Sequence, residues 1–151
     1  MEIFKIMTTI NKSALVAYEA SDMFNIVDDI DSYPDFLPWC GAASVENRSD
    51  DEVQASIQIS HSGINKSFTT RNRLQKDKMI EMQLVNGPFK HLHGFWQFKK
   101  LGENGCKISL DLEYEFSNKI VGLAIGPVFG QIASSLVDAF CKRADELYGG
   151  K

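Results

Sequence analysis

Between residues 43 and 116 apolar and polar side chains alternate along the chain, with the period of β-strands that have one covered face. The alternation is regular in "VQASIQI" (residues 53–59) and in "CKISLDLEYEF" (residues 106–116). In the second run one face carries only aliphatic and aromatic residues, Ile108, Leu110, Leu112, Tyr114 and Phe116. Strands with one apolar and one polar face are typical of antiparallel sheets, so this region predicts an antiparallel sheet.

Turn residues separate the strand-like runs. Asn104-Gly105 is a strong hairpin signal and joins "LHGFWQFKKL" to the run at residues 106–116. Weaker turn signals stand at Ser49–Asp51, Ser62-Gly63, Asp77 and Asn86–Pro88. With "INKSALVAY" (residues 10–18) as a first strand, the sheet is predicted to have about seven strands.

Helical spacing appears in two places. After the first strand, Ser21 is the predicted N-cap of a short helix with Met23, Ile26, Val27 and Ile30 on one side. After Phe116 a long helix is predicted, with an apolar stripe of Val121, Ile125, Val128, Phe129, Ile132, Leu136, Phe140 and Leu147. Gly126-Pro127 either kinks or restarts this helix, and Gly149-Gly150 ends it.

This order of elements predicts one α+β domain over residues 1–151. A curved antiparallel sheet of about seven strands grips a long C-terminal helix, with short helices after the first strand. One helix does not fill the concavity of such a sheet, so we expect a cavity between them. Cavities of this kind hold apolar ligands.

The stretch "SYPDFLPWC" (residues 32–40) is unusually apolar for a loop. Pro34 and Pro38 remove backbone donors and favour extended geometry before them, so we expect neither an ordinary helix nor a strand here. The large side chains of Tyr33, Phe36, Leu37 and Trp39 are therefore predicted to face the mouth of the cavity.

Charge and cysteine content narrow the class of protein. A net charge of −4 argues against DNA binding. A local basic cluster is either a contact for ribosomal RNA or a charged outer strand face: Lys66, Arg71, Arg73, Lys76 and Lys78. Three scattered cysteines without a C-x-x-C motif favour a reducing cytoplasm over a disulfide framework.

Two apolar segments bear on the location of the protein. "MEIFKIM" (residues 1–7) is too short and too charged for a signal peptide, and Met7 is an alternative start that would make the preceding residues an extension. Residues 120–137 carry no charge, and this uncharged run is just long enough for a membrane span. Polar and glycine residues dilute this segment, so we predict an amphipathic helix and leave peripheral contact with the inner membrane open. Gly122, Gly126 and Gly130 permit close approach to the sheet or to a docking partner.

Four ordered strings carry a family resemblance: "YPDFLPWC", "KSFTTRN", "VNGPFKHLHGFWQF" and "FSNKI". They resemble the bacterial RatA family of ribosome-association toxins, which belongs with the coenzyme-Q-binding, polyketide cyclase-like START proteins. The resemblance implies a START-like helix-grip fold, no catalysis and an apolar tunnel. Mitochondrial relatives bind ubiquinone and support respiration, and enterobacterial relatives bind the large ribosomal subunit and block subunit association. The chain departs from the family pattern at His91, His93 and Pro127.

The strand at residues 64–74 breaks the rule that polar residues face outward. A register set by Ile64, Phe68 and Leu74 turns Lys66, Thr70 and Asn72 inward as well. A buried polar group without a partner costs about 1–3 kcal/mol. Either these residues bond to each other, or they meet the polar head of a ligand, or a bulge reverses the register and turns Arg71 and Arg73 inward.

Inward-facing aromatic and aliphatic residues complete the predicted pocket, although plain core packing is the alternative for each. The predicted ligand-binding residues are Phe36, Leu37, Trp39, Phe68, Thr70, Asn72, Phe89, Leu92, Trp96, Phe98, Leu112, Tyr114, Phe129, Ile132 and Leu136. They favour ubiquinone, an isoprenoid or another lipid as the bound molecule.

Nothing in the chain indicates a catalytic or metal site. His91 and His93 have the spacing of a strand chelate but lack a third ligand, and Asp28, Asp29, Asp31 and Asp35 are interpreted as a solvated acidic face. Neither G-x-S-x-G nor a glycine-rich phosphate loop is present. We therefore expect a non-enzymatic protein without a cofactor that binds an apolar ligand, the ribosome, or both. A polyketide cyclase or aromatase is the alternative.

Overall fold

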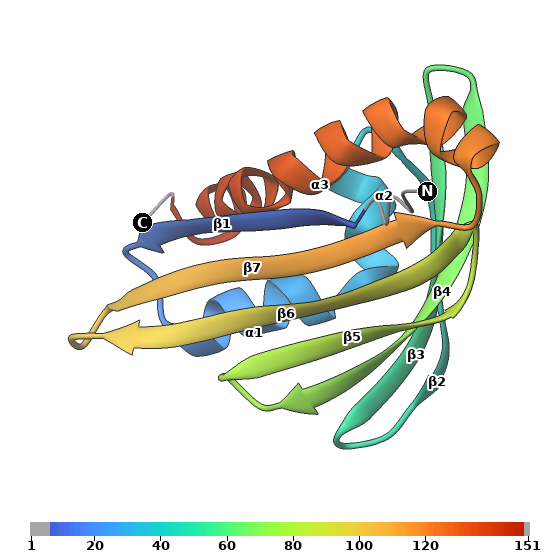
Figure 1. The fold of residues 1–151 in the computed structure, drawn as a ribbon. Helices are drawn as coiled ribbons and strands as arrows, with labels where there is room; N and C mark the ends of the chain where they lie inside the picture. Colours follow the sequence, from blue (N-terminus) through green and yellow to red (C-terminus); the bar gives the residue numbers. More distant parts are fainter. Residues whose placement is uncertain (1–6, 150–151) are drawn as a thin grey trace.

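The predicted antiparallel sheet is confirmed, with seven strands in the order β1-β7-β6-β5-β4-β3-β2. A computed structural model describes residues 7–149 (Figure 1). The strands are β1 (Thr8–Val16), β2 (Cys40–Arg48), β3 (Glu52–His61), β4 (Ile64–Gln75), β5 (Met79–Asn86), β6 (Phe89–Leu101) and β7 (Gly105–Phe116). The helices are α1 (Ala20–Asp28), the 3-10 turn η1 (Ile30–Ser32), α2 (Tyr33–Phe36) and α3 (Lys119–Tyr148). The expected extension before Met7 lies outside the described residues.

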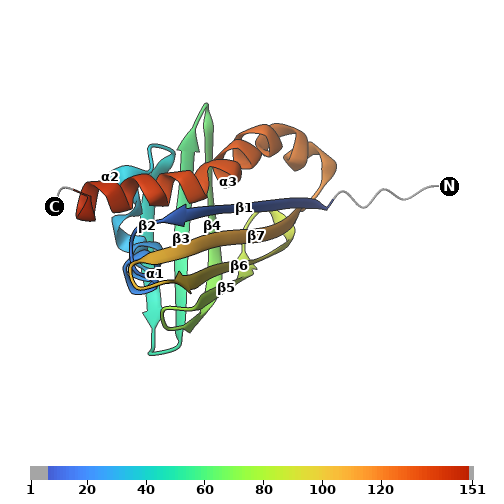
Figure 2. The ribbon, with the colours of Figure 1, turned by 90° about the vertical axis from the view of Figure 1, so that its left-hand side faces the viewer.

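The sheet curves strongly, and α3 crosses its concave side (Figures 1 and 2). α1 and α2 cover another part of the same side, so the core lies between the sheet and the helices. The inward faces of β3 and β7 match the predicted alternation: Val53, Ala55 and Ile59 are buried in β3 and Ile108, Leu110, Leu112 and Tyr114 in β7. This is the predicted helix-grip arrangement.

Several predicted boundaries were wrong by a few residues. β1 begins at Thr8 rather than Ile10. α1 begins at Ala20, and Glu19, not Ser21, occupies the N-cap without a side-chain bond. The β6–β7 hairpin is confirmed, but its left-handed residue is Gly102, with φ 62°, and Gly105 already pairs with Leu101. The loop therefore spans residues 102–104, within the predicted connection between residues 101 and 106.

The proline segment contains a helical turn, contrary to prediction. α2 spans Tyr33–Phe36, with Pro34 in its first turn, where its missing N–H is no loss. The Leu37 N–H donates to the Tyr33 carbonyl at 2.9 Å and ends the turn. Two prolines thus stiffen the segment without preventing one turn of helix.

α3 is one continuous helix of 30 residues, so Pro127 does not restart it. Its buried residues include Ile125, Phe129, Ile132 and Phe140 of the predicted stripe. Leu147 was assigned to this stripe wrongly, since 48% of it is exposed near the end of the helix. By length and hydropathy alone α3 is also long and apolar enough to cross a membrane.

Candidate functional site

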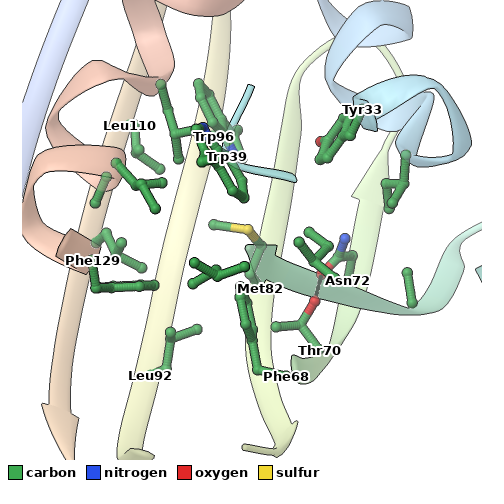
Figure 3. Close-up of a pocket in the computed structure, with 18 of the residues that line it drawn as sticks. Tyr33, Trp39, Phe68, Thr70, Asn72, Met82, Leu92, Trp96, Leu110 and Phe129 are labelled. Atoms are coloured by element: carbon green, nitrogen blue, oxygen red, sulfur yellow. Dashed lines mark hydrogen bonds between the residues drawn. The ribbon is translucent and has the colours of Figure 1, made fainter. Parts of the chain in front are cut away.

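A cavity of about 80 Å³ lies between the concave face of the sheet, α2 and the middle of α3 (Figure 3). It is lined by Ile30, Tyr33, Trp39, Ala55, Ile57, Ile59, Phe68, Thr70, Asn72, Met82, Leu92, Trp96, Leu110, Leu112, Phe129, Ile132, Ala133, Leu136 and Phe140. All of these side chains except Thr70 and Asn72 are apolar or aromatic. Ile57, Phe68 and Leu136 are only half-buried and mark the side that approaches solvent.

Ten of the predicted ligand-binding residues line this cavity: Trp39, Phe68, Thr70, Asn72, Leu92, Trp96, Leu112, Phe129, Ile132 and Leu136. They come from the proline segment, β4, β6, β7 and α3, which are far apart in sequence. In Figure 3 Trp39 and Trp96 lie toward one end of the cavity, and Phe68 and Leu92 lie toward the other. The structure brings these residues together as predicted, while their contact with a ligand stays a prediction.

Phe36 and Leu37 were expected at the cavity, but the structure places them outside its wall. Phe36 packs against Phe140 of α3, with ring centroids 5.7 Å apart, and the guanidinium of Arg143 lies 4.8 Å from the Phe36 centroid. Leu37 is only 1% exposed and belongs to the core. Because α2 makes one helical turn, Tyr33 faces the cavity while the residues that follow it point elsewhere.

Phe89, Phe98 and Tyr114 face inward as predicted but also lie outside the cavity wall. Phe89 stacks on Phe116 with centroids 5.1 Å apart, in an aromatic cluster at the end of the sheet where α3 begins. Tyr114 joins this cluster through Phe129, at 4.7 Å. Phe98 packs against Phe24 of α1 at 5.6 Å. Helix side chains fill the concavity at both ends, so the cavity remains only in the middle.

Nine lining residues were not among the predicted ligand-binding set: Ile30, Tyr33, Ala55, Ile57, Ile59, Met82, Leu110, Ala133 and Phe140. Ala55, Ile57, Ile59 and Leu110 carry the right signal, because they share the predicted inward face of their strands. Ala133 has no such signal, since its methyl group is too small to stand out in an apolar stripe. The alternation gives the direction of each side chain but not which ones meet.

The two polar side chains of the cavity bond to each other. The Thr70 hydroxyl donates to the Asn72 amide oxygen at 2.9 Å, and both residues are less than 10% exposed. Arg71 and Arg73 are exposed, so the register is not reversed. Lys66 is exposed too, contrary to prediction, because the β3–β4 hairpin tip projects past α3 (Figure 1).

The amide nitrogen of Asn72 lies on the side away from Thr70 (Figure 3). It is therefore available as a donor to a molecule inside the cavity. Trp39 and Trp96 add one indole N–H each to the wall. A ligand with a carbonyl or ether oxygen at one end and an apolar body suits this arrangement of few donors and many apolar atoms.

Tyr33 holds the proline segment against α1. Its hydroxyl donates to the Val27 carbonyl near the end of α1. Burial, together with the negative charge of Asp28, raises the pKa of the Tyr33 phenol far above its usual range, so it stays neutral and keeps donating. It is the only ionisable side chain among the lining residues, and its hydroxyl proton is engaged by the Val27 carbonyl.

His91 and His93, the two histidines with the spacing of a strand chelate, each lie beside a carboxylate. On the outer face of the sheet His93 lies 2.8 Å from Glu81, and His91 lies 3.0 Å from Glu113. No group of three metal-ligating side chains occurs within residues 7–149. The two histidines are cross-strand partners of carboxylates, far from the cavity.

The chain matches the family described as polyketide cyclase / dehydrase and lipid transport over residues 16–141. It is 47% identical to a ribosome association toxin RatA of Pseudomonas aeruginosa, covering 94% of this chain and 99% of that one. Identity to the RatA of Escherichia coli K12 is 42%, over 100% and 94% of the two chains. A mitochondrial coenzyme Q-binding protein COQ10 of Dictyostelium discoideum is 24% identical, over 87% and 66%.

Solved structures share the fold at low sequence identity. The Zhui aromatase/cyclase from Streptomyces sp. R1128 superimposes with a TM-score of 0.82 at 13% identity, covering 96% of this chain and 99% of that one. A START superfamily protein from Mycobacterium smegmatis gives 0.77 at 21% identity, over 92% and 98%. At these identities the likeness establishes the START-like fold alone.

Proposed function

We propose, from the premise that the chain belongs to the polyketide cyclase / dehydrase and lipid transport family and within it to the RatA family, that it is a non-enzymatic protein that binds an apolar molecule. The observation that carries this proposal is the wall of the cavity. All of its lining residues except one hydrogen-bonded polar pair are apolar or aromatic. Removing apolar surface from water supplies the affinity, at about 25 cal/mol per Å².

The size of the cavity adds a condition to the proposal. Ligand pockets usually enclose about 300–1,000 Å³, whereas this cavity encloses about 80 Å³. A quinone head or lipid chain therefore enters only if the wall moves outward. Met82 and Leu136 are half-buried lining residues with rotatable side chains, and α2 is a single turn joined to a short 3-10 turn. We place the expansion of the cavity at Met82, Leu136 and α2.

The ligand class follows from the polar groups. The free donor of Asn72 and the two tryptophan N–H groups suit an oxygen acceptor, such as a quinone carbonyl, at the inner end of an apolar molecule. The relative from Dictyostelium is named as a coenzyme Q-binding protein, which supports a quinone or isoprenoid as the first candidate. A cyclase or aromatase reaction needs an acid or a base beside the substrate. Tyr33, the one ionisable lining residue, is bonded to the Val27 carbonyl, which supports binding over this reaction.

Native mass spectrometry of protein purified from its own source tests the proposal. We expect a fraction of the protein to carry a bound molecule that organic extraction releases and that is identified as a quinone, isoprenoid or other lipid. Protein that carries no extra mass, and whose melting temperature does not change with added ubiquinone analogues, would contradict it.

Ribosome association is a second candidate, favoured by relatives of 42–47% identity named as ribosome association toxins. The basic side chains of β4 supply a surface for it, because Arg71 and Arg73 are exposed on the outer face. Glu52 lies 3.9 Å from both and only partly offsets their charge.

We expect added protein to reduce the fraction of joined ribosomes in sedimentation profiles, and Arg71→Glu/Arg73→Glu to lose this effect. Lys99→Glu/Lys100→Glu, the same charge change on β6, is the control. Profiles that do not change with added protein would count against it.

A further inference from the structure

The first turns of α3 present apolar side chains to solvent. Ile120 is 79% exposed and Leu123 is 71% exposed, which makes them two of the most exposed large apolar residues in the described part of the chain. Ala124 and Pro127 are exposed on the same side of the helix. Spacings of three and four residues place all four on one face, and we call these residues the α3 apolar face.

The α3 apolar face belongs to a helix whose apolar content is greater than its burial in the protein explains. Its most apolar window of eighteen residues has a mean hydropathy of 1.8, yet only 28% of that window is buried. The inward side is in the core, where Phe129 and Ile132 line the cavity (Figure 3). In the first turns of the helix the outward side is apolar and exposed. A helix held to a sheet along one side lies on a bilayer rather than crossing it.

Lysine side chains lie beside the α3 apolar face, whereas the carboxylates of α3 lie toward the other end of the helix. The chain has no Asp or Glu in residues 116–137 or 82–102, although its net charge is −4. The Ser117 N–H donates to the Pro88 carbonyl at 3.0 Å, which brings these two segments together. They contribute Lys119 and Lys90, the latter 3.9 Å from Glu115. The carboxylates of α3 all lie in its second half, at Asp138, Asp145 and Glu146.

We infer that the α3 apolar face, with Lys119 and Lys90 beside it, docks onto the surface of a lipid bilayer that contains anionic lipids. Aliphatic side chains enter the boundary between head groups and acyl chains, and nearby lysines meet the negative head groups. An RNA surface offers phosphates to the lysines but no place to bury Ile120 and Leu123. The inference goes beyond the proposed ligand binding and does not depend on it.

Co-sedimentation with vesicles of phosphatidylethanolamine and phosphatidylglycerol tests the inference, with pure phosphatidylcholine vesicles as the neutral comparison. We expect binding to the anionic vesicles that weakens with salt. Ile120→Ser/Leu123→Ser lowers the partition coefficient on the order of tenfold per side chain removed. Leu15→Ser is the matched control, because Leu15 is 73% exposed at the far end of β1 and is expected to bind as the wild type does (Figure 1).

The charge contribution is tested separately with Lys119→Glu. We expect its partition onto anionic vesicles to fall on the order of tenfold, and Lys100→Glu, the same change at the far end of β6, to leave it unchanged. All five substituted side chains are exposed, so the variants are expected to fold as the wild type does.

Three results would overturn the inference: no vesicle binding, equal binding by the wild type and Ile120→Ser/Leu123→Ser, or a concentration-dependent dimer that this variant abolishes without vesicle binding. Binding of single-stranded RNA that depends on Lys119 but not on Leu123 would assign the surface to RNA instead. Ligand content, measured by extraction in the same variants, is expected to stay unchanged. Failure of docking and failure of the cavity proposal are therefore distinguishable.

Discussion

Thr70 and Asn72 are the two polar side chains in the otherwise apolar wall of the cavity. Each is buried, and each satisfies part of its hydrogen-bonding capacity on the other. The pair leaves the Asn72 NH2 group out of this bond, and Asn72 lines the cavity, which makes it both a structural residue and the first candidate for contact with a ligand.

Removing one partner of this pair should cost more than removing both. Thr70→Val leaves the Asn72 oxygen buried without its donor, so we expect unfolding free energy to fall by about 1–3 kcal/mol. Thr70→Val/Asn72→Leu removes both groups and should regain part of this loss. Urea unfolding measures the effect, and Thr9→Val on exposed β1 is the control. A double variant that is less stable than the sum of its single changes would contradict this account.

The same double variant separates a structural pair from a ligand contact. If Asn72 donates to the ligand, affinity for a ubiquinone analogue falls while affinity for a plain hydrocarbon of similar size does not. Unchanged affinity for both ligands in the variant would reject the contact.

Cys141 is half-buried on α3, and its surroundings suppress its reactivity. Burial first, then the charges of Asp138 and Asp145, raise the pKa of its thiol from 9.0 to about 11. Only the thiolate is alkylated, so at pH 8 we expect iodoacetamide to modify it about a hundredfold more slowly than in urea-unfolded protein. Because the folded pKa is raised, the associated stability is present below pH 9 and is lost as the pH rises through about 11. Mass spectrometry of the labelled peptide follows the rate, and labelling with a midpoint near 9.0 would contradict this assignment.

At the scale of elements, α3 is the piece that makes the cavity. It approaches the sheet closely at its start, where a Cβ on Gly122 would lie 3.5 Å from the Phe116 ring and one on Gly130 would lie 3.6 Å from the Tyr114 hydroxyl. Both distances are ordinary van der Waals contacts, so a methyl group would fit at either position, and the role of these glycines in packing or docking stays a prediction. Further along, the cavity lies between α3 and the sheet.

The start of α3 is fixed by a side-chain cap. The Asn118 amide oxygen accepts the Val121 N–H at 2.9 Å. Asn118→Ala removes this bond and should lower the unfolding free energy by about 1 kcal/mol. Asn118→Asp keeps the acceptor and is the matched control, expected to stay near wild type in thermal unfolding. Equal losses in both variants would show that the cap is not the cause.

At the scale of the whole molecule, the curvature of the sheet exceeds what one helix can fill. The aromatic cluster around Phe89 closes one end and α1 closes the other, so the unfilled volume is confined to about 80 Å³ in the middle. The proposed ligand binding depends on this central space and on its ability to expand.

Filling the space should abolish binding without unfolding the protein. Ala133 is 1% exposed and lines the cavity from α3. Ala133→Leu adds three carbons that enter existing empty volume, so we expect unfolding free energy to stay within about 1 kcal/mol of wild type, below the usual cost of overpacking. The quantity of co-extracted lipid should fall sharply. Ser135→Leu places the same side chain on the exposed side of α3 and should retain the lipid. Full lipid content in Ala133→Leu would locate the ligand elsewhere.

The sequence by itself determined which way side chains point and in what order the elements follow. The alternation in residues 106–116 set the inward face of β7, and the stripe from Ile125 to Phe140 set the inward side of α3. These patterns are local, because the period of an element depends only on its own backbone geometry. They were enough for the fold, the presence of a central apolar region and ten of the lining residues.

Only the tertiary structure decided how deep each inward residue lies and what it meets. Leu110 and Tyr114 share one face of β7, yet Leu110 reaches the cavity and Tyr114 packs against Phe129. Tyr33 faces the cavity and Phe36 does not, although both are aromatic residues of one proline-rich segment. The physical reason is that the separation between α3 and the sheet changes along the helix, and contacts between residues distant in sequence set it. No periodicity along the chain records that distance.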